Sequence, residues 1–322
     1  MDKRRALFIT GASGFVGGAI AQALADRFTL RALSRSEGSD AAIRALGATP
    51  IRGELGKVTA DAIAGSEAVV HCAAFVKQWG TREQFWNANV EGTRQLLQAA
   101  RQAGARRFIH IGTEAALFHG QHMRDIDERY PYPVHTPFLY SETKAAAEKL
   151  VLAANAPGFA TLSIRPRFVW GPGDQTILPV LEAMVRSGRF MWIDGGRALS
   201  STTHIANLVH AVELALERGT GGNAYFVTDE GVTPMREFLT ALLATRRLTP
   251  PAKTIPGWLA RTLGTATETT WRVLGKTSEP PITRLAAAMM SRDCTITSDK
   301  ARRELGYQPV ISRNEGLREL SG

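Results

Sequence analysis

The sequence has few of the features that mark secreted, membrane and metal-binding proteins. Only two cysteines, Cys72 and Cys294, occur in 322 residues, so no disulfide framework is expected. No apolar stretch approaches the roughly 20 residues that span a bilayer. The basic start, Met1 to Arg5, lacks the apolar region and cleavage site of a secretory signal. The seven histidines show no metal-site spacing. We therefore expect a cytoplasmic protein without a catalytic metal.

The net charge of +9 indicates some attraction to an anionic cofactor, an anionic substrate or, weakly, a membrane surface, but a basic solvated surface is the stronger interpretation. The basic residues are scattered in pairs such as Arg106 and Arg107, and no nucleic-acid recognition motif accompanies them. We expect a small-molecule substrate and no nucleic acid.

Short apolar runs alternate with helix-like stretches through the first half of the chain. The runs Ala6 to Thr10, Ala68 to Cys72 and Arg107 to Ile111 read as buried strands, and residues 83–103 form a long helix-like stretch. Buried strands that alternate with helices indicate a doubly wound parallel sheet. The sequence therefore predicts an α/β fold of the Rossmann type.

The second half of the chain is less regular. A dense turn signal at Gly171 to Asp174 indicates that the chain leaves the first domain there, and the patterns at 203–228 indicate a return. We expect a dinucleotide-binding domain of residues 1–170 and about 203–228. Residues about 171–202 and 229–322 are expected to form a smaller, mostly helical substrate-binding region.

Three glycines follow the first strand and open a helix-like stretch. Glycine allows a tight turn and a close approach of the backbone to a pyrophosphate, and the helix N-terminus offers unpaired N–H groups. A glycine triplet alone could be a simple turn, but its strand and helix context favours a dinucleotide site. The cofactor contacts expected here are Gly11, Ser13, Gly14, Phe15, Val16 and Gly17.

Tyr140 and Lys144 lie four residues apart in a helix-like segment, so their side chains share one face. The Lys144 ammonium can then favour ionisation of the Tyr140 phenol, which with a pKa of about 10 is otherwise a poor base at neutral pH. A buried aromatic beside a solvated charge is the alternative. The glycine motif upstream favours a tuned acid–base pair.

These motifs together resemble an extended short-chain dehydrogenase/reductase of the NAD(P)-dependent epimerase/dehydratase superfamily. The resemblance rests on Thr10 to Gly17, on Thr113 and on the Tyr140–Lys144 pair, and it covers essentially the whole chain. The stretch Ile111 to Ala116, with the Arg-Pro-Arg-Phe-Val-Trp-Gly segment, is most similar to 3β-hydroxysteroid-dehydrogenase-like and dihydroflavonol-reductase-like members.

The resemblance implies catalytic roles for three residues. Tyr140 would transfer the proton, Lys144 would bind the nicotinamide ribose and tune Tyr140, and Thr113 would orient the substrate oxygen. A homodimer through the helices near residues 83–103 and 141–155 is expected from the resemblance only.

The end of the second strand indicates the choice of cofactor. Ser34, Arg35 and Ser36 stand where an NAD site places an acidic residue. A guanidinium can bind a 2′-phosphate with two hydrogen bonds, and the serines can add hydroxyl donors. We expect NADP. The alternative, that Arg35 stacks on adenine or lies in solvent, leaves NAD open.

Further contacts are implied by the resemblance. The remaining cofactor residues would be Glu54, Leu55, Ala73, Ala74, Pro166, Phe168 and Val169, although Glu54 is longer than the aspartate usual in the family. The substrate candidates are Glu114, Arg167 and His204. Arg167 would either face a polar substrate or pair with a carboxylate such as Asp174, and His204 is more simply read as structural.

The function predicted from the sequence is an NADP-dependent oxidoreductase that interconverts a ketone and a secondary alcohol on a steroid-like, flavonoid-like or other fairly apolar substrate. One alternative is a nucleotide-sugar epimerase or dehydratase with tightly bound NAD. Another is a non-catalytic protein that senses NADP, although such a protein has no need for the Tyr140, Lys144 and Thr113 set.

Overall fold

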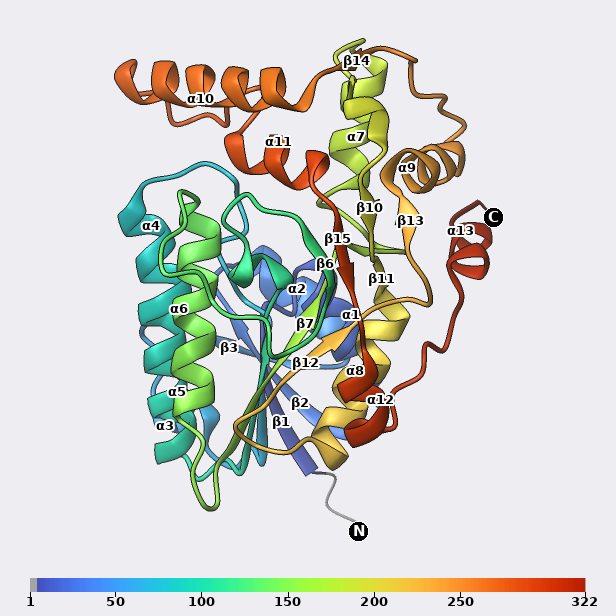
Figure 1. Ribbon diagram of the computed structural model, residues 1–322. Coiled ribbons are helices and arrows are strands. Elements are labelled where there is room, and N and C mark those ends of the chain that lie inside the picture. Colours follow the sequence, from blue (N-terminus) through green and yellow to red (C-terminus); the bar gives the residue numbers. More distant parts are fainter. Residues whose placement is uncertain (1–4, 322) are drawn as a thin grey trace.

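A seven-stranded parallel sheet forms the centre of the computed structural model, which describes residues 5–321 (Figure 1). Residues 1–4, most of the basic start considered above, lie outside the described part. The strand order is β12-β7-β5-β4-β1-β2-β3. The strands are β1 (Arg5–Thr10), β2 (Phe28–Ser34), β3 (Thr49–Arg52), β4 (Ala68–His71), β5 (Arg107–Ile111), β7 (Ala160–Pro166) and β12 (Ala224–Val227). The predicted α/β fold is confirmed.

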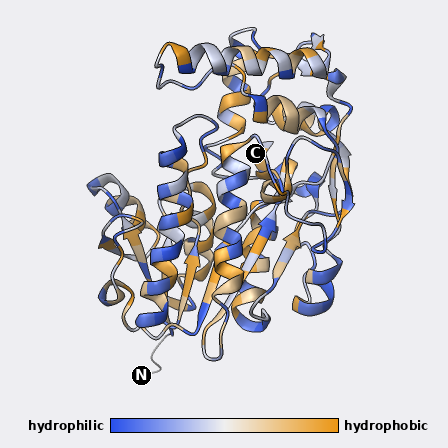
Figure 2. Cartoon of the chain, turned by 60° about the vertical axis from the view of Figure 1, so that its left-hand side comes forward, coloured by the Kyte–Doolittle hydropathy of each residue, from blue (hydrophilic) through white to orange (hydrophobic). Residues whose placement is uncertain are grey.

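Helices cover both faces of this sheet, because the side chains of each buried strand alternate between two apolar cores. In β1, Leu7 and Ile9 face one core and Phe8 faces the other. The first core is covered by α1 (Phe15–Leu24), α2 (Glu37–Ala45) and α8 (Ile205–Arg218). The second is covered by α3 (Ala60–Ile63), α5 (Gly92–Gln102) and α6 (Leu139–Ala153). Figure 2 shows the apolar strands enclosed between these layers.

The long helix expected at residues 83–103 is interrupted by a π-helical turn. It consists of α4 (Arg82–Trp86), the π segment Asn87–Glu91 and α5. Within the π segment, the Asn89 carboxamide bonds both backbone groups of Phe75 and also donates to the Thr143 hydroxyl at 3.1 Å. The π turn thus links the loop after β4 to α6, and such turns often occur near functional sites.

The C-terminal part of the chain lies beyond the carboxyl ends of the large sheet (Figure 1). It contains α7 (Leu178–Arg186), α9 (Met235–Ala244), α10 (Gly257–Val273), α11 (Arg284–Ser291) and α13 (Arg313–Ser321). A second sheet has the order β13-β10-β15-β6, from β6 (Met123–Ile126), β10 (Leu199–Ser200), β13 (Thr233–Pro234) and β15 (Cys294–Ile296). The remaining strands are β8 (Val169–Trp170), β9 (Trp192–Ile193), β11 (Thr203–His204) and β14 (Thr254–Ile255).

The chain returns to the large sheet more often than the sequence predicted. The expected return at 203–228 supplies α8 and β12. A later one supplies α12 (Asp299–Leu305), whose Ala301 and Leu305 join the core on the α1 side, together with the buried ring of Tyr307. Part of the 229–322 segment therefore packs on the sheet.

None of the helices in residues 5–321 combines the length and the apolarity needed to cross a membrane. Large apolar side chains are nevertheless exposed on and after α10, at Trp258, Leu263, Val273 and Leu274.

Candidate active site

The loop between β1 and α1 has the geometry that close approach to a phosphate requires. Gly11 has φ +76°, and a Cβ on it would lie 2.8 Å from the Ala73 nitrogen; a Cβ on Gly17 would lie 2.3 Å from the Gly11 oxygen. No side chain caps the N-terminus of α1, so its first-turn N–H groups face outward from the loop at the positive end of the helix. This cradle fits the pyrophosphate of a dinucleotide.

Ser34, at the end of β2, and the next two residues, Arg35 and Ser36, differ in what they can offer to a ligand. The buried Ser34 hydroxyl donates to the Ser36 oxygen, and the Ser36 hydroxyl caps α2 by accepting from the Ser39 N–H. Arg35 is exposed. Glu54 is also exposed and pairs with Lys57 at 2.9 Å, which lowers the pKa of Glu54; Arg35 lowers it further. Arg35 therefore provides the cation at this end of the site.

Tyr140, Thr113 and Lys144 come together where β5 ends against α6. Thr113 follows β5 and donates its hydroxyl to Glu114 Oε2 at 2.8 Å. Burial and the Glu114 carboxylate raise the pKa of Tyr140 above its ordinary value, while a hydrogen bond with Thr113 lowers it. Lys144, itself buried, donates to the Ile111 carbonyl at 2.9 Å. The predicted grouping of these three residues is therefore present.

The predicted effect of Lys144 on Tyr140 is not found. The net shift in the pKa of Tyr140 is upward, and Lys144 is not among the groups that cause it. The Lys144 ammonium is directed instead to the Ile111 carbonyl and to His110 Nε2, 3.3 Å away. Burial lowers the pKa of Lys144 to about 8, although the negative charge of Glu148 acts to raise it.

Glu114 and Arg167 form a buried ion pair next to Thr113 and Tyr140. Their side chains are 2% and 4% exposed, respectively, and Arg167 Nε also donates to the Ser200 hydroxyl at 3.3 Å. Of the two alternatives for Arg167, pairing with a carboxylate is correct, but the partner is Glu114. Asp174 instead accepts backbone N–H groups of residues 176–178.

The turn between β7 and β8 holds the expected nicotinamide residues. Pro166 ends β7, Val169 begins β8, and Phe168 between them has φ +45°, which is costly for an aromatic residue. A Cβ on Gly173, just beyond, would lie 3.8 Å from the Phe15 ring. The loop after β8 therefore lies beside the start of α1.

Tyr140 also lines a small pocket between the sheet and the C-terminal helices. Aromatic rings from the loop after β4, from α4 and from the segment before α6 form one side of it, and α10 and α11 contribute charged groups. The lining consists of Gln78, Trp79, Gly80, Phe85, Pro137, Phe138, Leu139, Tyr140, Glu268, Arg272, Arg284 and Leu285. The indole N–H of Trp79 donates to the Lys276 carbonyl at 3.1 Å, so this lining residue is bonded to the segment that follows α10.

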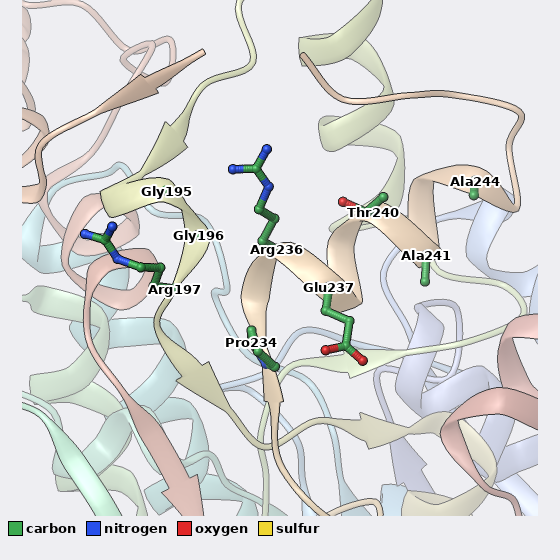
Figure 3. A pocket seen from close by; sticks show the side chains of 9 residues that line it. All are labelled: Gly195, Gly196, Arg197, Pro234, Arg236, Glu237, Thr240, Ala241 and Ala244. Carbon is green, nitrogen blue, oxygen red and sulfur yellow. The ribbon is translucent and has the colours of Figure 1, made fainter. Parts of the chain in front are cut away.

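Two other places do not join this site. A groove between Gly195–Arg197 and α9, shown in Figure 3, contains neither Tyr140 nor a residue of the glycine loop. His204, a substrate candidate, caps α8 through Nδ1 and packs against the Trp170 ring. These contacts give His204 a structural role.

Sequence reasoning missed the buried polar residues around Lys144. His110 of β5 and Ser163 of β7 bond each other, and Ser163 donates to Glu148 of α6. The signal was present in β7, where Thr161, Ser163 and Arg165 alternate with the core residues Leu162 and Ile164. A row of polar residues on one face of a fully buried strand indicates an internal polar network.

The chain is similar to known oxidoreductases over nearly its whole length. The profile of the 3-beta hydroxysteroid dehydrogenase/isomerase family matches residues 8–254. A 4-hydroxy-2-methyl-3-oxo-4-farnesyl-3,4-dihydroquinoline-1-oxide ketoreductase of Stigmatella aurantiaca is 42% identical over 316 residues, which are 97% of this chain and 95% of the relative. A 2-alkyl-3-oxoalkanoate reductase of Stenotrophomonas maltophilia is 35% identical over 98% of each chain.

Solved structures share the fold. Gox2253 superposes with a TM-score of 0.75 at 28% identity, over 98% of this chain and 97% of that one. UDP-glucuronic acid 4-epimerase from Bacillus cereus, in complex with NAD, superposes with a TM-score of 0.74 at 18% identity, over 98% of each chain. At that identity the second likeness concerns the fold alone.

Proposed function

Because the chain belongs to the 3-beta hydroxysteroid dehydrogenase/isomerase family, we propose that it is an NADP-dependent reductase that converts a ketone of a fairly apolar substrate into a secondary alcohol. The chain is a dehydrogenase or reductase that acts on CH–OH groups. What we propose beyond this is the direction of the reaction, the preference for NADP, the kind of substrate and the catalytic residues.

The observation that supports the proposal is the contact of Tyr140 with Thr113, together with Lys144, which lies four residues on in α6 and bonds the end of β5. A phenol with a raised pKa keeps its proton at neutral pH, so Tyr140 is suited to donate that proton to a developing alkoxide. Thr113 orients the substrate oxygen, and the Lys144 ammonium binds the ribose. Bound NADPH supplies the hydride.

The preference for NADP rests on Arg35. It is exposed at the end of β2, where its guanidinium can bind a 2′-phosphate, and the nearby carboxylate of Glu54 is paired with Lys57. The Ser34 hydroxyl donates to the Ser36 carbonyl, whereas the Ser36 hydroxyl accepts from the Ser39 N–H and keeps its own hydrogen for donation to a phosphate.

The proposed substrate is an apolar ketone with a ring or a long chain. The rings of Trp79, Phe85 and Phe138 beside Tyr140 offer flat apolar contact. The names of the two relatives describe a farnesylated 3-oxo-dihydroquinoline oxide and a 2-alkyl-3-oxoalkanoate, which are both ketones with apolar substituents. A nucleotide-sugar epimerase remains the second candidate, favoured only by the shared fold.

A ketone panel measured with NADPH and NADH in parallel tests the proposal. We expect NADPH oxidation with apolar ketones, and loss of turnover in Y140F with NADPH binding retained. Tyr130→Phe is the matched control, because its hydroxyl contacts Gln121, outside the catalytic group. Tightly retained dinucleotide without net turnover would favour the epimerase, and unchanged physiological output in Y140F would favour a sensor.

A further inference from the structure

A chain of buried hydrogen bonds leads from the Lys144 ammonium into the protein. Lys144 Nζ lies 3.3 Å from His110 Nε2, and His110 Nδ1 lies 3.1 Å from Ser163 Oγ. Ser163 Oγ lies 2.7 Å from Glu148 Oε2. Each of these four residues is at most 4% exposed, so water does not compete for the bonds.

The donor and the acceptor of each hydrogen bond in this series follow from Glu148, the last group in it. The pKa of Glu148 is held low by Arg165, so its carboxylate is ionised and can only accept. Ser163 has one hydroxyl hydrogen and must donate it to Glu148. The serine oxygen can then only accept from His110, which places the histidine hydrogen on Nδ1.

His110 Nε2 consequently presents a lone pair to Lys144. Burial and the charge of Lys144 lower the pKa of His110 well below its usual value, so the ring is neutral and carries one hydrogen. With that hydrogen on Nδ1, Nε2 accepts an N–H of the ammonium. A second N–H goes to the Ile111 carbonyl. One of the three donors of Lys144 is then left for a ligand.

Glu148, at the far end of this series of hydrogen bonds, is held in place by its neighbours. Arg165 Nε donates to both oxygens of Glu148 at 3.0 Å, and the Tyr132 hydroxyl donates to Oε1 at 2.6 Å. Gly112 gives room for the network, since a Cβ there would lie 2.5 Å from Ser163 Oγ and 2.8 Å from Glu148 Oε2. The glycine that precedes Thr113 is thus required by the hydrogen-bond chain.

We propose that His110 is a positioning residue whose tautomer, set by Ser163 and Glu148, holds the Lys144 ammonium with one N–H directed at the cofactor ribose. The inference rests on the proposed function for its catalytic consequence, but the tautomer can be measured without turnover. The other charged and titratable groups facing His110 and Lys144 are His71 and Cys72 from the β4 side and Arg165 from β7. Within residues 5–321, none of these groups accepts a hydrogen bond from Lys144.

Nitrogen-15 spectroscopy of the imidazoles in the full chain tests the tautomer directly. His110 is assigned by its absence in H110Q. We expect a protonated Nδ1 and a non-protonated Nε2 in the wild type across neutral pH. In S163A the hydrogen is free to move to Nε2, whereas the signals of His71, which bonds Thr10 and Thr93, should stay unchanged. A hydrogen on Nε2 in the wild type overturns the proposal.

Kinetics test the consequence for Lys144. Replacing His110 by Phe removes the acceptor and should lower kcat roughly 10-fold to 100-fold, the range expected for a hydrogen bond to a charged group. H110Q keeps an oxygen that can accept from Lys144 and should recover most of that loss. Equal kcat in H110F and the wild type, with both folded by circular dichroism, contradicts the positioning role. If the wild type reduces no ketone while Nδ1 carries the hydrogen, the proposed function fails and the tautomer assignment stands.

Discussion

At the scale of single residues, the site combines a phenol that keeps its proton with an ammonium that is close to losing its own. Burial and Glu114 raise the pKa of Tyr140, whereas burial lowers the pKa of Lys144 to about 8. Tyr140 therefore keeps the proton that the proposed reduction requires. Lys144 is mainly charged below about pH 8 and mainly neutral above it.

The proposed contact of Lys144 with the cofactor ribose predicts that cofactor binding depends on pH. Below about pH 8 the ammonium is present in the free protein, and it is lost as the pH rises through that value. We expect NADPH binding, followed by fluorescence at constant ionic strength, to weaken as the pH rises above 8. Lys144→Arg keeps its positive charge at high pH, so this variant should not show the weakening of NADPH binding above pH 8. Binding that is unchanged from pH 7 to pH 10 contradicts the assigned role.

Arg35 should decide between the two dinucleotides. Replacing it with serine removes the cation that faces the 2′-phosphate, so we expect the Kd for NADPH to rise about 10-fold or more while that for NADH stays nearly constant. Arg44→Ser, at an exposed position on the neighbouring α2, is the control. If binding of NADPH and NADH weakened equally, Arg35 would not be the residue that recognises the 2′-phosphate.

Residue types and order were enough to predict Tyr140, Lys144 and Thr113 as one group. They were not enough to predict that Glu114 pairs with Arg167, because these residues come from separate segments that only the folded β5 and β7 bring together. The same holds for His110, whose partner Ser163 lies on the neighbouring strand. Partners across a parallel sheet depend on register, which a single sequence leaves open.

At the scale of elements, the glycine loop and α1 form the part of the cofactor site that tolerates least change. In Gly17→Ala the added methyl would lie 2.3 Å from the Gly11 oxygen, so the loop must shift. We expect NADPH binding to fall sharply in a binding titration, with the fold retained by circular dichroism.

Gly38→Ala is the matched control for this element. Gly38 lies in α2, and a Cβ there meets no atom within 4 Å. Alanine should stabilise the helix by about 0.5–1 kcal/mol without changing NADPH binding. Equal binding by the two alanine variants would contradict the close packing of the glycine loop.

Periodicity predicted the elements of the large sheet well, since β5 was expected at Arg107 to Ile111 and lies there. It did not predict the π turn at Asn87–Glu91, because the i+5 bonds follow from the contacts of Asn89 with Phe75 and Thr143. Short strands of the second sheet, such as β10 and β13, have two residues each, which is too few for a period to show.

At the scale of the whole molecule, two returns of the chain complete the large sheet and the helices around it. The first, at residues 203–228, was predicted from the sequence, but α12 was not expected on the core because it is short and charged. Its apolar Ala301 and Leu305 are buried against α8 and β12. The domain boundaries drawn from the sequence remain a prediction.

A homodimer is the quaternary state we expect, through the outer faces of α5 and α6, which pack side by side on one layer of the molecule (Figure 1). Sedimentation equilibrium should give about twice the chain mass of 34.9 kDa. A monomer at every concentration tested would contradict this expectation.

Binding to anionic vesicles tests the weak membrane contact. The wild type is compared with W258S, and V134S is the control because it changes another exposed apolar residue.

The central claim, that Tyr140 supplies the proton while NADPH supplies the hydride, is tested most directly by isotope transfer. NADPH deuterated at the transferring position of its nicotinamide is mixed with an apolar ketone and the wild-type protein, Y140F or Y130F. We predict one deuterium on the carbinol carbon of the product with the wild type and Y130F, and no measurable product with Y140F. Full transfer by Y140F, or product without deuterium, would contradict the account.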